Sequence, residues 1–130
     1  MTYQMIVTDL DGTLLNSRSS LSQKTILTIE RLKKENKIIV IASGRTYAEI
    51  VRLTKPLDLL SYNKAYFICY NGVLTVKTNP FTVLMKITLK KDDVKQIIDS
   101  LKDQDIKYHI FGENRLFLSN DIKYTLEDHQ

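Results

Sequence analysis

Several residue types that mark specialised protein classes are scarce in this 130-residue sequence. It holds one cysteine, Cys69, so it has no means of forming an internal disulfide framework of the kind found in small secreted domains. No apolar run approaches the roughly 20 residues that span a bilayer, which argues against a transmembrane helix. The basic region and apolar core of a signal peptide are also lacking, so we expect a cytoplasmic protein.

A cluster of basic residues interleaved with aromatics is lacking as well. The net charge of +4 comes mostly from lysines spread along the chain. This mild excess suits an anionic ligand, although solvated surface lysines account for it equally well. We therefore expect neither a nucleic-acid partner nor a membrane partner. With 43% hydrophobic and 26% charged residues, the chain has the composition of one ordinary globular domain rather than of a disordered protein.

The first part of the sequence alternates between two hydrophobic periods. Short, largely apolar runs are typical of strands buried in a parallel sheet, and apolar residues recurring at threes and fours indicate helices. Ser22 and Thr46 are expected to cap the helices, and Pro56 to end the second one. The pattern predicts strands over 3–8, 38–42 and 65–70, and helices over 23–35 and from 47 to before 56.

The remainder reads as α+β. Runs at 73–76 and 82–89 flank a polar turn and predict a strand pair, and an amphipathic helix follows, with Asp92 or Asp93 as its cap. Two more strands are expected over 106–111 and 115–119, joined by a turn at 112–114. We predict an α/β fold in which residues 1–80 form an incomplete, three-layer, doubly wound (Rossmann-like) parallel-sheet core and residues 81–130 form a second, α+β part.

The stretch DLDGTLL, residues 9–15, follows the first predicted strand directly. In an extended segment Asp9 and Asp11 project to the same side, and two carboxylates at this spacing suit either two catalytic roles or one Mg²⁺ ion. Open α/β sheets bind their ligands at the carboxyl ends of strands. Gly12 permits a tight turn, after which the amides, beginning with that of Thr13, can point at an anion. A turn or a helix cap is the alternative for either aspartate taken singly.

Three motifs resemble the haloacid dehalogenase superfamily, and within it the Cof-type sugar-phosphate phosphatases. They are DLDGTLL at 9–15, IASGR at 41–45 and YNG at 70–72, each at the end of a predicted strand. The resemblance covers residues 3 to about 76 well. The segment that follows looks more loosely like the start of the family's α+β cap, which we assign to residues 81–130.

By this resemblance Asp9 is the nucleophile that forms an aspartyl-phosphate, and Asp11 is the general acid and base. Mg²⁺ is held by the Asp9 carboxylate and the Asp11 main-chain carbonyl. Ser43 and the Gly44 amide bind phosphate. Arg45 reaches phosphate, pairs with a carboxylate or faces solvent, and Asn71 lies at the site mouth or forms an ordinary turn.

The resemblance also implies parts that this sequence does not show. The family has a lysine after the cap and an acidic Gly-Asp-type motif, but none of the four glycines here is followed by aspartate. We therefore expect the N-terminal part of a longer protein, a Mg²⁺-dependent phosphatase of small phosphorylated metabolites, with little activity in this chain alone. The alternative is a non-catalytic module that binds a phosphate ligand or a partner, or that self-associates through an open sheet edge.

Overall fold

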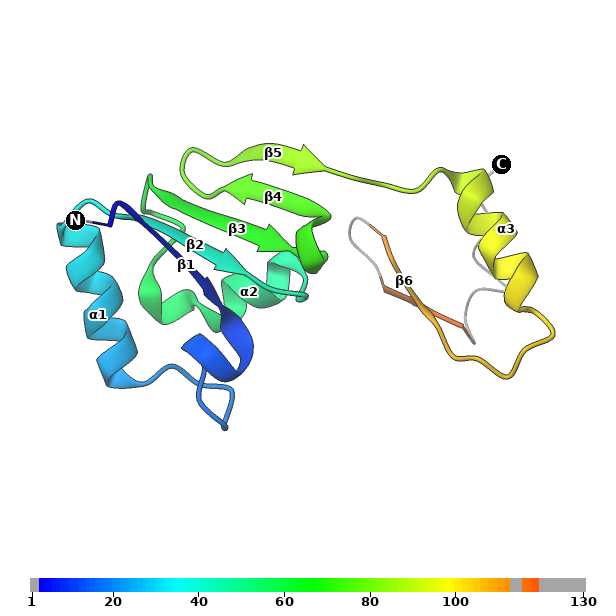
Figure 1. The fold of residues 1–130 in the computed structure, drawn as a ribbon, viewed down its shortest axis with the longest axis horizontal. Coiled ribbons are helices and arrows are strands. Elements are labelled where there is room, and N and C mark those ends of the chain that lie inside the picture. The colour runs from blue at the N-terminus through cyan, green and yellow to red at the C-terminus, as the bar shows by residue number, and fades with distance from the viewer. Residues whose placement is uncertain (1–2, 113–115, 120–130) are drawn as a thin grey trace. The chain divides into compact units, whose positions relative to one another are not determined.

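A five-stranded mixed sheet forms the centre of the first structural unit. The computed structural model describes residues 3–112 and 116–119, and its first unit ends at Thr88. The strands lie in sequence order in the sheet, with β1, β2 and β3 parallel and β4 and β5 added antiparallel (Figure 1). Their bounds are β1 Met5–Asp9, β2 Ile38–Ala42, β3 Ala65–Cys69, β4 Leu74–Lys77 and β5 Thr82–Lys86.

Two helices connect the parallel strands, α1 (Gln23–Lys34) and α2 (Tyr47–Leu53). Both predicted caps are confirmed: the Ser22 hydroxyl accepts from the Thr25 amide, and Thr46 forms a capping box with Glu49. The second helix ends before Pro56 as predicted, and a 3₁₀ turn, η2 (Lys55–Leu57), contains the proline. Two further turns, η1 (Leu10–Leu14) and η3 (Tyr70–Gly72), follow β1 and β3.

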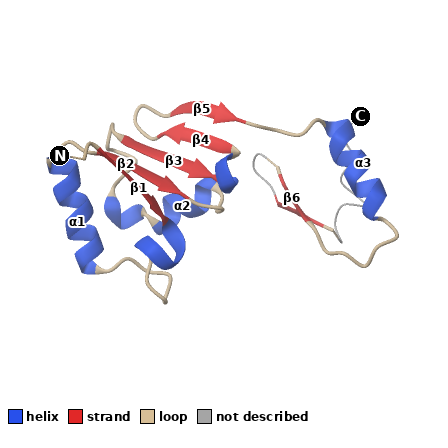
Figure 2. Ribbon diagram, in the orientation of Figure 1, coloured by secondary structure: helices blue, strands red, loops and turns tan. Residues whose placement is uncertain are grey.

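The core lies on one face of the sheet. Ile29 of α1 and Ile50 of α2 pack in a single buried cluster with Ile39, Ile41 and Phe67, which point to the same side of β2 and β3. Figure 2 shows the two helices on this side of the strands. The predicted α/β class with a parallel-sheet core is confirmed. Because the helices described in this unit cover one face, the core is incomplete, as predicted.

The second unit, from Leu89 onward, contains α3 (Lys91–Leu101) and a two-stranded ribbon of β6 (His109–Phe111) and β7 (Leu116–Leu118). The predicted cap of α3 was wrong. Lys90 precedes the first turn, and Asp92 and Asp93 lie inside that turn, where negative charge favours the helix dipole. The turn expected at 112–114 falls largely outside the described residues.

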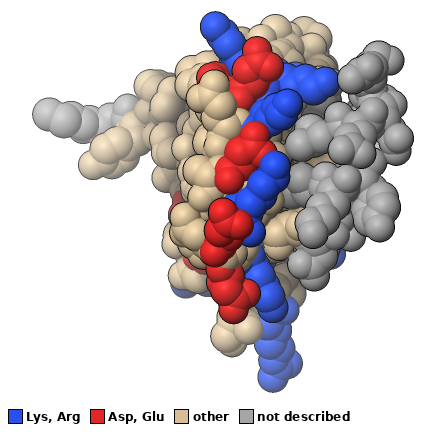
Figure 3. All heavy atoms as spheres, turned by 90° about the vertical axis from the view of Figure 1, so that its right-hand side faces the viewer, with Lys and Arg blue, Asp and Glu red and all other residues tan. Residues whose placement is uncertain are grey.

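The two units divide between Thr88 and Leu89, whereas the expected boundary lay at residue 80. The reason is β5, which pairs with β4 and so extends the first unit's sheet. That residues after the boundary form part of a cap stays a prediction. Figure 3, seen from the side of α3, shows acidic and basic side chains next to one another on that face, without a large patch of one sign.

Candidate active site

The DLDGTLL stretch forms a turn held at both ends by buried leucines. The strand ends at Asp9, and the Leu15 amide donates to the Leu10 carbonyl at 2.8 Å, which closes a six-residue turn. Leu10 and Leu15 lie in the core cluster, so the polar residues between them remain at the surface. Gly12 adopts φ +72°, a left-handed conformation that glycine enters without steric cost.

Backbone hydrogen bonds join the loops that follow β2 and β3. The Ser43 amide donates to the Ile68 carbonyl at 2.9 Å, and the Asn71 amide donates to the Ser43 carbonyl at 3.2 Å. The Tyr70 amide donates to the Arg45 carbonyl at 3.0 Å. These bonds fix the IASGR and YNG motifs against each other at the carboxyl end of the sheet.

The side chain of Asn71 closely approaches Gly44. A Cβ at position 44 would lie 2.9 Å from Asn71 Oδ1, closer than real Cβ atoms come to such atoms. Tyr70, Asn71 and Gly72 all have positive φ, at 52°, 54° and 99°. Left-handed conformations cost non-glycine residues free energy and are concentrated at functional sites. The Val73 amide donates to the Tyr70 carbonyl at 3.3 Å across Asn71 and Gly72, so this pair forms the Asn-Gly hairpin turn that was one alternative for Asn71. The positive φ of Tyr70 is the feature that such a turn does not require.

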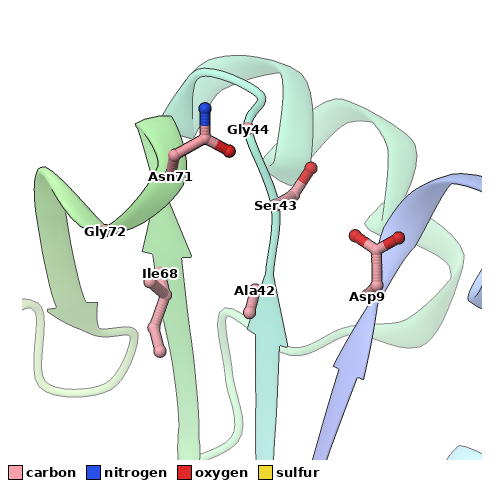
Figure 4. A pocket seen from close by; sticks show the side chains of 7 residues that line it. All are labelled: Asp9, Ala42, Ser43, Gly44, Ile68, Asn71 and Gly72. Atoms are coloured by element: carbon pink, nitrogen blue, oxygen red, sulfur yellow. The ribbon is translucent and has the colours of Figure 1, made fainter.

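A cavity of about 280 Å³ opens at this end of the sheet. It is lined by Asp9, Ala42, Ser43, Gly44, Ile68, Asn71 and Gly72. Figure 4 shows the Asp9 carboxylate and the Ser43 hydroxyl above the ends of adjacent strands, with the Asn71 amide beside Gly44. The structure thus brings four of the predicted site residues together: Asp9, Ser43, Gly44 and Asn71.

Asp11 and Arg45 form a separate arrangement that does not line this cavity. The Arg45 guanidinium donates to both carboxylate oxygens of Asp11, from Nε at 2.7 Å and from Nη2 at 2.9 Å. Its Nη1 donates to Glu49 Oε1 at 3.1 Å. Of the three alternatives expected for Arg45, the structure shows the second, in which its guanidinium pairs with a carboxylate. The hydrogen bonds from Arg45 lower the pKa of Asp11, so this carboxyl is held in its ionised form.

Glu49 was not identified from the sequence, although a signal was present. It lies three residues after Thr46, the spacing of a capping box, and four after Arg45, the spacing of a helical ion pair. The backbone and side chain of Thr46 donate to Glu49 Oε2, which lowers the pKa of Glu49 and fixes its position. Gly12 and Thr13 lie in the η1 turn and do not line the cavity.

The oxygen donors of this site suit a hard cation. Asp9 presents an exposed carboxylate to the cavity, and Mg²⁺ commonly takes one or two protein carboxylates and keeps several waters. The Asp11 side chain is engaged by Arg45, which leaves its main-chain carbonyl as the donor that the resemblance implies. Among the described residues, no three acidic, histidine or cysteine side chains gather at one point.

The cysteine and the one histidine that the structure describes do not line this cavity. Cys69 is buried, and burial raises the pKa of its thiol to about 11, which keeps it protonated and unreactive. His109 is exposed on β6, and His129 lies outside the described residues. Within the described part of the chain, no helix is both long enough and apolar enough to cross a bilayer.

The chain is similar to several known proteins. The chain is 29% identical over 118 residues to the Putative phosphatase YxeH of Bacillus subtilis, covering 91% of this chain and 43% of that protein. A solved haloacid dehalogenase-like hydrolase of Bacteroides thetaiotaomicron has the same fold, with a TM-score of 0.79 at 24% identity, over 90% of this chain and 44% of that one. TM0651 of Thermotoga maritima matches with a TM-score of 0.75 at 26% identity, over 90% and 42%.

The chain thus spans less than half the length of these relatives. The family model described as haloacid dehalogenase-like hydrolase matches residues 6–130, nearly the whole sequence. The chain belongs to the haloacid dehalogenase-like hydrolase family.

Proposed function

We propose that the protein is a Mg²⁺-dependent, cytoplasmic phosphatase of small, sugar-phosphate-like metabolites. The observation that carries the proposal is the cavity in which the Asp9 carboxylate lies with Ser43, Gly44 and Asn71. A hydroxyl, a side-chain amide and the backbone at Gly44 are groups that bind phosphate oxygens, and a carboxylate beside them is a nucleophile for phosphorus. The names of several relatives as phosphatases support the reaction class.

In the proposed reaction an Asp9 oxygen attacks phosphorus, forms an acyl-phosphate bond and breaks the ester P–O bond. Asp11 gives a proton to the leaving alkoxide, later takes one from the hydrolytic water, and inorganic phosphate is released with Asp9 regenerated. A bound Mg²⁺, held by Asp9 and the Asp11 carbonyl, would neutralise charge on the phosphate.

The Arg45 pair sets a condition on this scheme. While both oxygens of Asp11 accept from Arg45, the carboxyl is ionised and has no proton to give. Asp11 must therefore leave Arg45 before the first step. The same pair favours a second candidate function, a module that binds phosphate without hydrolysing it, because the Ser43 hydroxyl and the backbone at Gly44 do not depend on Asp11 to bind an anion.

Two measurements separate these functions. Hydrolysis of an aryl phosphate is followed with Mg²⁺ for the longer protein of which this chain is expected to be the N-terminal part, and for its Asp9→Asn variant, because little activity is expected of the 130 residues alone. A phosphatase loses its Mg²⁺-dependent turnover in the variant, and equal rates would exclude the proposed nucleophile. Asp92→Asn, which removes one exposed carboxylate from α3, is the matched control. Calorimetric titration with inorganic phosphate then identifies binding without turnover, the result expected of the second candidate.

A further inference from the structure

Tyr70 adopts a backbone conformation that its turn does not require. It begins η3 with a φ of 52°, a left-handed value that costs a bulky residue free energy. A two-residue Asn-Gly turn needs positive φ only at its two central residues, which here are Asn71 and Gly72. Such strain persists only where surrounding contacts hold the residue in place. The contacts of Tyr70 must therefore offset this cost.

The side chain of Tyr70 is anchored at the first turn of α2. Its hydroxyl accepts a hydrogen bond from the backbone of Tyr47, the first residue of that helix. The centroid of the Tyr47 ring lies 6.1 Å from that of Phe67, in the core, and 5.7 Å from that of Phe81. Burial raises the pKa of the Tyr70 hydroxyl, so this group stays uncharged at neutral pH. The anchor is thus a neutral hydrogen bond to a residue that is itself packed against the core.

The backbone of Tyr70 connects this anchor to the cavity. Its amide donates to the Arg45 carbonyl at 3.0 Å, and the amide of the next residue, Asn71, donates to the Ser43 carbonyl at 3.2 Å. The Asn71 side chain approaches Gly44 closely. Asn71, Ser43 and Gly44 all line the cavity, whereas Tyr70 does not. Tyr70 can therefore act on a bound ligand only through these neighbours.

We infer that Tyr70 is a positioning residue of the candidate site: its anchored hydroxyl and its left-handed backbone hold the loop after β3 so that Asn71 and Ser43 meet a phosphate group together. The inference rests on the proposed function for the identity of the ligand. Without the anchor, the loop has to be ordered as the phosphate binds. This cost weakens binding of the substrate and of the transition state alike, so it raises KM and leaves kcat unchanged.

Amide hydrogen exchange in the ligand-free chain measures the anchor directly. Tyr70→Phe keeps the ring and removes the hydroxyl, and the amides of Tyr47 and Asn71 should then exchange about fivefold faster, the factor that corresponds to one neutral hydrogen bond. The amide of Ile41, fully buried in the central strand β2, should keep its wild-type rate. Unchanged exchange at Asn71 would overturn the inference, and so would an equal rise at all three amides, which indicates a general loss of stability.

Tyr70→Gly separates the side chain from the backbone strain. Glycine accepts a left-handed conformation without steric cost, but it provides no anchor and leaves the backbone more freedom. Exchange at Asn71 should therefore be faster in Tyr70→Gly than in Tyr70→Phe. A wild-type rate in Tyr70→Gly would show that the side chain does not hold the loop. Circular dichroism confirms that each variant is folded, and the exchange rates of Tyr70→Phe decide the case if Tyr70→Gly does not fold.

Tyr62→Phe is the matched control. It removes a half-buried tyrosine hydroxyl that donates to the Lys37 carbonyl at 2.7 Å. Lys37 directly precedes β2, at the end of the sheet opposite the cavity. The variant therefore loses the same kind of bond without touching the loop after β3. We expect wild-type exchange at Asn71 in this variant.

Hydrolysis of an aryl phosphate with Mg²⁺ by the expected longer protein gives the kinetic test. Tyr70→Gly should raise KM by about fivefold or more at an unchanged kcat, Tyr70→Phe should raise it less, and Tyr62→Phe should change neither constant. An unchanged KM in a folded Tyr70→Gly variant would overturn the positioning role. A wild type without turnover would instead refute the proposed function, and the exchange rates at Asn71 would then decide the role of Tyr70 by themselves.

Discussion

Replacing Gly44 by alanine tests the closeness of the two loops at the cavity. The new Cβ would lie 2.9 Å from Asn71 Oδ1 and 3.4 Å from Asn71 Cγ, so the contact is with a side chain rather than with backbone. Asn71 is exposed and can rotate away, and the cost therefore falls at the low end of the range for overpacking, about 1 kcal/mol of the free energy of unfolding. Urea unfolding, followed by circular dichroism, measures the change.

The same substitution in a second variant shows whether the contact with the Asn71 side chain causes this loss of stability. In Asn71→Gly, which removes the side chain and accepts the left-handed backbone, Gly44→Ala should change the free energy of unfolding by less than about 0.5 kcal/mol. Gly12→Ala is the contrasting case, because nothing lies within 4 Å of its Cβ while φ is +72°; it should cost about 1 kcal/mol through backbone strain alone. An equal loss from Gly44→Ala in both backgrounds would refute the steric argument.

Two further predictions concern the turn after β1. Leu10→Ala, at a fully buried position, should lower the free energy of unfolding by about 2–5 kcal/mol, whereas exposed Leu84→Ala should cost below about 1 kcal/mol; similar urea midpoints for the two would contradict the anchoring role of Leu10. Because Arg45 lowers the pKa of Asp11, their pair stabilises the folded chain above the ordinary aspartate pKa and loses this effect as the pH falls below about 4. Arg45→Gln should therefore show a shallower loss of stability in acid, and the difference should be small because the Asp11 side chain is 47% exposed. An unchanged pH profile would refute the pairing.

The parts of the fold that sequence predicted well depend on local signals. Ser22 and Thr46 form caps where their residue types and the following helical period place them. The strand that ends at Asp9 and the helix that stops before Pro56 were likewise set by neighbouring residues. Local chemistry decides such features, so a single sequence contains the information.

The features that sequence did not predict depend on contacts between distant residues. Nothing in the apolar run at 82–86 indicates which strand it pairs with, and in the structure it pairs with β4. Asp11 and Arg45 lie 34 positions apart, and only the fold brings them within hydrogen-bond distance. The positive φ of Tyr70 is unexpected for a bulky residue and follows from the bonds that hold its loop.

At the candidate site the motifs predicted the cavity residues but not their division into two groups. Asp9, Ser43 and Asn71 meet as expected, since all follow strands that end at one edge of the sheet. Asp11 was expected beside Asp9 because an extended backbone was assumed, and the strand instead ends at Asp9 and is followed by a turn that a hydrogen bond from the Leu15 amide to the Leu10 carbonyl closes. Asp9 lines the cavity, whereas Asp11 pairs with Arg45.

Three hydrogen bonds that join the loops after β2 and β3 are between backbone groups, from the amides of Ser43, Tyr70 and Asn71. Such bonds do not depend on which side chains stand at these positions. Over evolutionary time, a lineage can therefore exchange the reactive side chains of this site while its backbone frame persists. New specificities, or the loss of catalysis, can therefore arise by single substitutions while the backbone of the two loops keeps its arrangement.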